Sequence, residues 1–404
     1  MGVGVVGGRW VPFIATLVVG ATPLARDLLA QNTTRVDAPY FEVDPLWPKP
    51  LPNHWLLGST IGVSVDERDH VWIIHRSSAT LNDNEKGLEL RPQRSECCAG
   101  APPVLEFDQA GNLVGHWGGP GKGFEWPASN HGITVDHKGN VWVGGNGPED
   151  SQVLKFTRDG KFLMQVGKSA ARRGSAGPAG EPTYVGGSHD SQSFGRVAKI
   201  FVDPKTNEAY LADGYLNKRV AVIDADTGAL KRYWGAYGRK PDDADRGPYR
   251  PDAPPADQFR NPVHCADVSN DGLVYVCDRP NNRLQVFRTD GTFVKEMVFA
   301  KGTLGAGAAW DIAFSKDPGQ RFLYIADGMN MKVRVVRRDT LEELTSFGDG
   351  GRQPGQFYGV HSLATDSRGN LYATETYEGK RVQRFIYRGL RPVRTRDQGV
   401  VWPR

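Results

Sequence analysis

The chain has 404 residues, of which 39% are hydrophobic and 24% charged, a composition typical of soluble globular proteins and not of disordered ones. Its 49 glycines and 27 prolines are spread along the sequence, which predicts many tight turns between short strands and therefore an all-β fold. The formal net charge of +4 is too small an excess to indicate a nucleic-acid-binding protein.

Residues 1–30 have the pattern of an export signal. Arg9 supplies a positive charge before the mostly apolar stretch 10–25, and Leu28-Leu29-Ala30 forms a small-residue cleavage site. An uncleaved membrane anchor is the alternative, against which two prolines in the apolar region argue. We therefore expect a secreted or periplasmic protein that has no membrane contact after the signal is cleaved.

Four cysteines in an oxidising compartment permit disulfide bonds. The neighbours Cys97 and Cys98 are compatible with either one vicinal disulfide or two separate bonds. Cys265 and Cys277 are symmetric about Asp271 in a predicted hairpin. A short turn there would place the two cysteines opposite each other and predicts a cross-strand disulfide.

One sequence phrase recurs six times: an apolar strand that ends in Asp or Ser, a turn, a second apolar strand and a third strand. The clearest copies, residues 132–143 and 362–373, read GITVDHKGNVWV and SLATDSRGNLYA. Turns such as Asp159-Gly160 then indicate a fourth strand. Six copies of four short antiparallel strands predict an all-β, six-bladed β-propeller over residues 36–390.

The last copy of the repeat ends near Tyr387 after only three strands, and the segment 40–46 is a predicted strand without a partner. We expect this N-terminal strand to form the outer strand of the sixth blade and to close the ring, which would protect the last sheet edge. The phrase resembles the NHL-repeat propellers over about residues 40–390. That resemblance implies a fold but says little about function.

Three long segments interrupt the repeat, at residues 77–103, 168–193 and 239–257. Long loops of a propeller commonly cover one mouth of its channel, where ligands bind, and we expect that here, with a plain surface loop as the alternative for 168–193. The Arg-rich C-terminal tail, residues 391–404, is expected to be partly ordered and solvated.

Three histidines occupy equivalent places in alternate blades. The position five residues before the Asp or Ser that ends each first strand is, in blade order, Ile61, His131, Ala198, His264, Trp310 and His361. Because the first strand of each blade lines the propeller axis, the three imidazoles are expected to lie about 120° apart and to converge.

Three neutral imidazoles with an open fourth position are the arrangement of a catalytic zinc site. Zinc is the expected ion, although imidazole also suits iron, copper and nickel. Such an ion polarises a substrate oxygen or activates a bound water. The alternative is that His131, His264 and His361 are ordinary residues of the channel wall.

The contexts of these histidines, residues 130–132, 263–265 and 360–362, resemble those of the peptidyl-α-hydroxyglycine α-amidating lyases. These enzymes are six-bladed propellers whose zinc is held by three axial histidines. The residue before each histidine is not proline here, as it is in that family. The family also has an Asp after the third histidine that helps to bind a structural calcium, and Ser362 in its place argues against calcium here.

Two further positions match the same family. The phrase Asp213-Gly-Tyr-Leu-Asn-Lys-Arg219 resembles the one that carries its catalytic tyrosine, and Ile74-His-Arg76 resembles the context of its arginine. The resemblance implies that Tyr215 acts as a general base and that Arg76 binds a carboxylate or a developing anion. The residues alone would indicate only a strand-end aromatic and a surface arginine.

The pattern as a whole predicts an exported, metal-dependent lyase that cleaves a C–N or C–O bond at a hydroxylated carbon. The substrate would be a small molecule or peptide-derived. A metal-dependent hydrolase that uses the same site and a non-enzymatic NHL binding propeller are the alternatives. A closed propeller needs no partner, so a monomer is expected.

Overall fold

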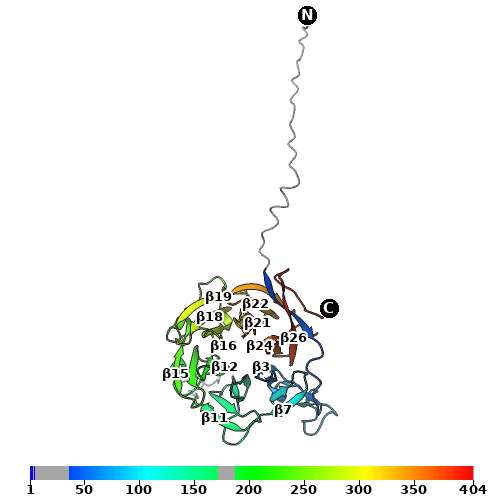
Figure 1. Ribbon diagram of the computed structural model, residues 1–404, viewed down its shortest axis with the longest axis vertical. Helices are drawn as coiled ribbons and strands as arrows, with labels where there is room; N and C mark the ends of the chain where they lie inside the picture. Colours follow the sequence, from blue (N-terminus) through cyan, green and yellow to red (C-terminus); the bar gives the residue numbers. More distant parts are fainter. Residues whose placement is uncertain (3, 5–35, 172–186, 404) are drawn as a thin grey trace. The chain divides into compact units, whose positions relative to one another are not determined.

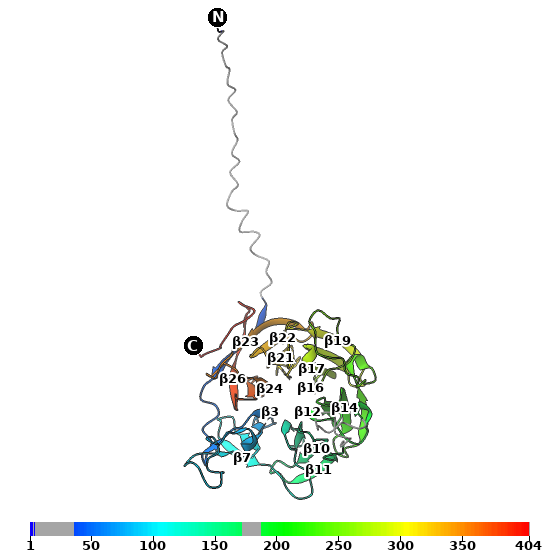
Figure 2. The same ribbon diagram turned by 180° about the vertical axis from the view of Figure 1, so that it is seen from behind.

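The computed structural model describes residues 1, 2, 4, 36–171 and 187–403, so the predicted export signal lies almost entirely outside the described residues. The chain divides into Met1–Val36 and a compact unit, Asp37–Arg404. The described part of this unit contains six four-stranded antiparallel sheets arranged in a ring (Figures 1 and 2). No helix of the described residues is long and apolar enough to span a membrane.

The first three blades follow the chain, each from its inner to its outer strand. Their strands are β3 (Thr60–Val65), β4 (Val71–His75), β6 (Val104–Phe107) and β7 (Leu113–Trp117); β8 (Asn130–Val135), β9 (Val141–Gly145), β10 (Gln152–Phe156) and β11 (Phe162–Gly167); β12 (Val197–Asp203), β13 (Glu208–Asp213), β14 (Arg219–Asp224) and β15 (Leu230–Trp234).

Blades four and five have the same form, and within the described residues four single-turn 3-10 helices lie in connections between strands. The strands are β16 (Val263–Val268), β17 (Leu273–Asp278), β18 (Arg283–Arg288) and β19 (Phe293–Val298); β20 (Asp311–Phe314), β21 (Phe322–Asp327), β22 (Lys332–Arg337) and β23 (Glu342–Phe347). The 3-10 helices are η1 (Ser77–Thr80), η2 (Gly187–His189), η3 (Ala236–Gly238) and η4 (Arg279–Asn281).

The sixth blade confirms the predicted closure of the ring. Its sheet has the order β1-β26-β25-β24, where β24 is Val360–Thr365, β25 is Leu371–Glu375, β26 is Arg381–Pro392 and β1 is Asp37–Asp44. The N-terminal strand pairs antiparallel with the last strand of the chain, with Phe41 opposite Tyr387. The Phe41 ring also packs on Tyr324 and Phe347 of blade five, so the closing strand adds to the core between the blades.

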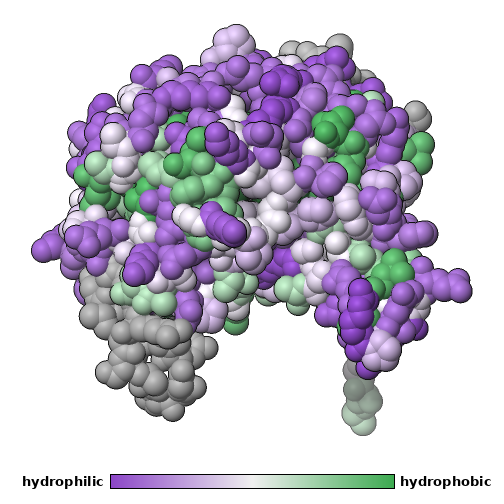
Figure 3. All heavy atoms as spheres, turned by 90° about the horizontal axis from the view of Figure 1, so that it is seen from below, coloured by the Kyte–Doolittle hydropathy of each residue, from purple (hydrophilic) through white to green (hydrophobic). Residues whose placement is uncertain are grey.

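The middle strands of the blades are the most completely buried. All five residues of β9 are buried, as expected for a strand covered on both faces by neighbouring blades, whereas exposure alternates along the outermost strand β7. The hydrophobic core accordingly consists of clusters that each span two adjacent blades; one joins Trp72 and Ile74 of blade one to Ile133 and Leu154 of blade two. Figure 3 shows that the edge of the disc is mostly hydrophilic, with scattered hydrophobic areas.

The Asp of the repeat phrase has a structural role. Asp136 Oδ1 accepts hydrogen bonds from the backbone N–H groups of Lys138 and Asn140, at 2.9 Å each, and so holds the turn after the first strand. Its Oδ2 accepts the indole N–H of Trp142 at 2.9 Å. Asp66 and Asp366 bind their own turns in the same way. The repeat phrase therefore encodes one turn braced by a buried carboxylate.

The long loop 77–103 is attached to the rest of the propeller by an ion pair and by a short strand. Glu85 in that loop pairs with Lys380 of blade six at 2.8 Å, and β5 (Ala99–Gly100) pairs in parallel with β2 (Trp55–Leu56).

Disulfides join Cys97 to Cys98, one of the two arrangements left open, and Cys265 to Cys277, the expected cross-strand pair. Residues 172–186 of the segment 168–193 lie outside the described residues.

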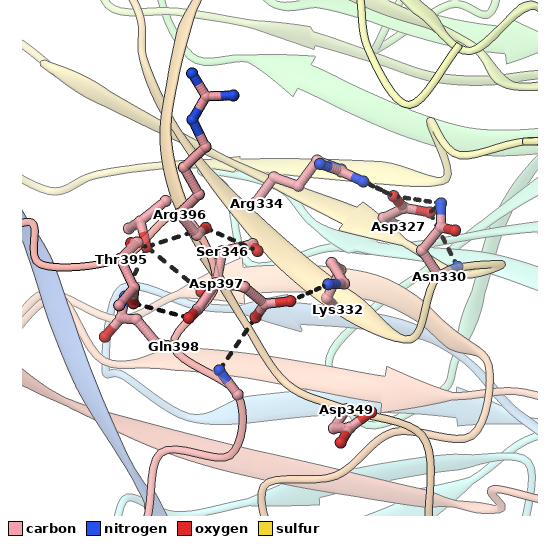
Figure 4. A network of polar contacts seen from close by, with 12 residues as sticks. Asp327, Asn330, Lys332, Arg334, Ser346, Asp349, Thr395, Arg396, Asp397 and Gln398 are labelled. Atoms are coloured by element: carbon pink, nitrogen blue, oxygen red, sulfur yellow. Dashed lines mark hydrogen bonds and ion pairs between the residues drawn. The ribbon is translucent and has the colours of Figure 1, made fainter. Parts of the chain in front are cut away.

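The C-terminal tail is ordered and is bound to the propeller more closely than a solvated extension would be. It runs beside the outer strand β23, where the Ser346 N–H donates to the Arg396 carbonyl at 2.8 Å (Figure 4). Asp397 pairs with Lys332 at 2.5 Å, and the Val401 carbonyl accepts the N–H of Val43. The physical reason is the unpaired edge of blade five, whose backbone groups need partners. The side chains of Arg394 and Arg396 nevertheless remain exposed.

We expect Asp136→Ala to lower the free energy of unfolding by about 2–4 kcal/mol, because it leaves the Trp142 indole and two backbone N–H groups without their acceptor. Urea unfolding followed by tryptophan fluorescence would measure this. Asp290→Ala, in an exposed turn, is the matched control and should change stability by no more than about 0.5 kcal/mol. Equal losses in both variants would contradict the bracing role of Asp136.

Candidate metal centre at the propeller axis

The structure brings the three axial histidines together. His131, His264 and His361 are each the second residue of a first strand, β8, β16 and β24, and their exposed fractions are 2%, 3% and 4%. The ring centroids lie 4.9 to 5.0 Å apart, and one nitrogen of each ring lies within 4.8 Å of those of the other two. Alternate blades therefore deliver three imidazoles to one point.

Each imidazole is oriented by the blade that follows it. His131 Nδ1 contacts the carbonyl of Ala198 at 2.6 Å, His361 Nδ1 contacts that of Ile61 at 2.6 Å, and His264 Nδ1 contacts that of Trp310. A carbonyl oxygen can only accept, so Nδ1 must carry the proton in all three rings. The Nε2 lone pairs are consequently available at the axis, which is the tautomer that metal-binding histidines commonly adopt.

Glycine follows His131 because the strands approach closely there. A Cβ on Gly132 would lie 2.8 Å from the Ala198 carbonyl oxygen, the acceptor for His131 Nδ1. A Cβ on Gly62, which follows Ile61, would lie 3.1 Å from the His131 carbonyl oxygen. The His-Gly pair in the sequence therefore reflects the narrow gap between neighbouring first strands at the axis.

The histidines are held in their neutral form. Burial lowers the pKa values of His131 and His264 well below the ordinary imidazole value. Burial, with smaller contributions from Arg279 and Arg76, lowers the pKa of His361 to about 3. Neutral imidazoles are the form that binds a metal ion.

Tyr215 points at the same place. Its phenol oxygen lies 2.8 Å from His131 Nε2 and 3.1 Å from His264 Nε2. One hydroxyl proton can satisfy only one of these two acceptors, so the three lone pairs at the axis are better matched by a cation. The three-nitrogen donor set could therefore hold a metal ion.

The turn that carries Tyr215 is rigid. It follows β13, and a fully buried ion pair at 2.7 Å joins Asp213 to Arg219 across it, while Asn217 donates to the same carboxylate. Gly214 faces the Val263 backbone so closely that a side chain there would collide with it. The same brace of Asp, Asn and Arg recurs in blade five as Asp327, Asn330 and Arg334 (Figure 4).

Arg76 follows β4 and lies beside the axis without touching Tyr215. Its Nε donates to the Asn130 carbonyl at 3.3 Å, and its Nη2 donates to Asn146 Oδ1 at 2.9 Å. Burial lowers its pKa, while the nearby Tyr215, Tyr377 and Asp150 oppose that shift. Among the described residues its hydrogen bonds go to neutral groups, so its charge can act on an incoming anion.

Arg279 is a further residue beside the axis that the sequence pattern did not indicate. Its Nη1 donates to the Tyr215 phenol oxygen at 3.3 Å, and its guanidinium stacks on the Trp310 ring at 4.6 Å. Its Nε is buried and has no hydrogen-bond partner among the described residues. Its position in the repeat could have indicated it, because Arg279 directly follows the second strand of blade four as Arg76 follows the second strand of blade one.

A second group of potential metal ligands is already paired with an arginine. Asp66, His70 and Glu106 lie together at the seam between blades one and two. The guanidinium of Arg158 pairs with Asp66 at 2.6 Å and also with Glu106, and His70 contacts Glu106. The arginine occupies the position that a cation would need, so this cluster joins the two blades.

Comparisons with known proteins identify the fold class of this chain. The NHL repeat model matches residues 263–287, which include β16 and β17. A solved structure of streptogramin B lyase is 13% identical with a TM-score of 0.50, covers 87% of this chain and 98% of its own, and shows the fold alone. The chain is a six-bladed β-propeller with NHL repeat sequence.

Several curated relatives are amidating enzymes, and another is NHL repeat-containing protein 3 of Mus musculus, which is 25% identical over 77% of this chain and 71% of that protein. Peptidyl-glycine alpha-amidating monooxygenase A of Xenopus laevis is 26% identical over 243 residues, which cover 60% of this chain and 23% of that protein. Peptidyl-alpha-hydroxyglycine alpha-amidating lyase 1 of Drosophila melanogaster is 25% identical over 371 residues, 85% of this chain and 59% of that protein. The chain spans about a quarter of the length of the monooxygenases it matches. It is homologous to this enzyme family at modest identity.

The buried neutral histidines predict how the stability of the metal-free protein depends on pH. An unfolded imidazole binds a proton below about pH 6.5, whereas His361 in the folded protein does so only near pH 3. The free energy of unfolding should therefore fall as the pH is lowered between these values, by up to about 1.4 kcal/mol per pH unit for this residue.

The His361→Gln variant should show a weaker fall, measured by urea unfolding at pH 7 and pH 5 after chelation of metal. His189→Gln replaces an exposed imidazole and should leave the pH dependence unchanged. An unaltered pH dependence in His361→Gln would contradict the neutral, buried state of His361.

Proposed function

We propose that this protein is a metal-dependent lyase that cleaves a C–N or C–O bond at a hydroxylated carbon, with His131, His264 and His361 as the metal ligands. The observation that carries the proposal is the convergence of three Nε2 lone pairs with the Tyr215 phenol oxygen at one buried point. A bound zinc ion would supply Lewis acidity toward a substrate oxygen.

The residues around the metal centre favour an anionic substrate. Arg76 and Arg279 flank the axis, and their hydrogen bonds within the described part of the chain go to carbonyl, amide and phenol oxygens. The buried, unpartnered Nε of Arg279 is a donor that a substrate carboxylate would satisfy. An α-hydroxy acid, such as an N-acyl-α-hydroxyglycine, combines the required hydroxyl with such a carboxylate.

Tyr215 is positioned to act on the substrate hydroxyl. In the proposed reaction its phenolate takes the hydroxyl proton while the C=O bond of the product forms and the C–N bond breaks. The nitrogen leaves with the bonding electrons and gains a proton, so the products are an amide and an aldehyde acid. The guanidinium of Arg279 donates to the Tyr215 oxygen at 3.3 Å and so fixes its position beside the axis.

The relationship to an amidating lyase supports the choice of a lyase, and the two disulfides support export to an oxidising compartment. We propose a secreted or periplasmic monomer that acts on a small or peptide-derived substrate. The hydrolase and binding-propeller alternatives share the same axial histidines. A hydrolase would turn over its substrate without Tyr215, and a binding propeller would have no turnover.

Mass spectrometry of the purified protein should find about one zinc or other transition-metal ion per chain, because three fixed imidazoles form a preorganised site. His131→Ala, His264→Ala and His361→Ala should each lose the ion, while His189→Ala, which removes an exposed imidazole, should retain it. A wild-type protein without metal, or metal retained in all three axial variants, would rule out the proposed centre.

Tyr215→Phe should keep the metal and lower turnover of N-acyl-α-hydroxyglycine by about 10²–10⁴-fold, because it removes the proton acceptor but little volume. Release of the aldehyde acid would be followed with a colorimetric carbonyl reagent. Tyr233→Phe, which lies outside the centre, is the control and should retain full turnover. Undiminished activity of Tyr215→Phe would favour a hydrolase with a metal-activated water instead.

A further inference from the structure

Behind the three histidines, on the opposite side from Tyr215, the axis is crossed by a cluster of buried ionic groups. Lys199 Nζ lies 2.6 Å from Asp311 Oδ1 and 2.9 Å from Asp267 Oδ2, and these side chains are 14%, 3% and 7% exposed. Burial alone would disfavour the ammonium charge, but the two carboxylates outweigh it and raise the pKa of Lys199. The cluster therefore joins the inner strands β12, β16 and β20 through charged hydrogen bonds.

A fourth strand is bound to the same cluster. Asp311 Oδ2 accepts the Ser362 hydroxyl at 2.7 Å and the Leu363 N–H at 2.9 Å, and both residues follow His361 on β24. A small cavity of about 10 Å³ separates the cluster from the imidazoles and is lined by all three histidines, Lys199 and Asp311. The ionic groups thus form the floor of the candidate metal centre.

The cluster adjoins the groups that orient the imidazoles. Lys199 directly follows Ala198, whose carbonyl accepts the Nδ1 proton of His131. Asp311 directly follows Trp310, whose carbonyl accepts the Nδ1 proton of His264. The short bond between Lys199 and Asp311 therefore ties together the two backbone segments that hold these carbonyls in place.

We propose that Lys199 and Asp311 are positioning residues for the axial centre: their ion pair fixes the carbonyls of Ala198 and Trp310, and with them the Nδ1–H tautomer of His131 and His264. The proposal rests on the proposed function for its purpose, because the tautomer matters when Nε2 binds a metal. The orientation itself is a property of the metal-free protein and can be tested there.

The test is NMR spectroscopy of the full-length, metal-free protein labelled with ¹⁵N-histidine, in which the two ring nitrogens report the tautomer of each imidazole. In the wild type, His131, His264 and His361 should each show a single Nδ1–H form. In Lys199→Met, His131 and His264 should show mixed tautomers or lose their distinct signals. Signals would be assigned with His→Gln variants of each position.

Lys155→Met is a matched control. Lys155 is also a buried lysine between two blades, where its Nζ donates to the Ala225 carbonyl at 2.8 Å. It lies on β10, the third strand of blade two, and its nearby carboxylate, Asp136, comes five residues after His131, at the far end of β8. Both variants should lose stability, and only Lys199→Met should alter the tautomers. A Lys199→Met protein with wild-type tautomers would overturn the proposal.

Asp311→Asn serves if Lys199→Met does not fold, because it keeps the size of the side chain and an oxygen acceptor for Ser362 while it removes the charge. It should disturb His264 in the same experiment, and unchanged tautomers in this variant would also overturn the proposal. A second measurement is zinc affinity, which should fall by about 10- to 100-fold in either variant, as is typical when groups behind a metal ligand are altered. A wild-type protein that binds no metal would refute the proposed function, whereas the tautomer experiment would still decide the roles of Lys199 and Asp311.

Discussion

The hydrogen bond from each axial imidazole to the carbonyl of the next blade is the interaction on which the site depends. It joins His131 to Ala198, His264 to Trp310 and His361 to Ile61, so all six equivalent positions take part, three as imidazoles and three as acceptors. The bond from His361 to Ile61 crosses the seam between the last and first blades. Closure of the ring by β1 is therefore a condition for the complete centre as well as for the fold.

Charge is distributed unevenly along the axis. On one side of the histidines lie two cations, Arg76 and Arg279, together with the Tyr215 phenol; on the other side lies the compact cluster of Lys199 with two carboxylates. The imidazoles between them are neutral because burial disfavours their protonation. An anion that approaches from the Tyr215 side would therefore meet the two guanidinium groups.

The blades carry this site on turns that are braced from within. A buried carboxylate at the end of the first strand holds one turn, as Asp136 does, and an Asp–Arg pair after the second strand holds the next, as Asp213 and Arg219 do. The second kind of turn carries Tyr215 in blade three and begins with Arg279 in blade four, where Asp278 and Arg283 form the pair. Because this second kind of turn recurs from blade to blade, it places different side chains in equivalent positions around the axis.

The sequence by itself determined the six-bladed propeller, the closing strand, the Cys265–Cys277 pair and the common register of the three histidines, because each of these follows from a repeat period or from strand alternation. It did not reveal Arg279, whose importance depends on contact with Tyr215 from a different blade. It also did not indicate where the C-terminal tail binds, because the unpaired edge of β23 that binds it exists only in the folded ring. The tautomers of the imidazoles and the buried ion cluster of Lys199 were decided by the tertiary structure alone, since their partners come from blades far apart in the chain.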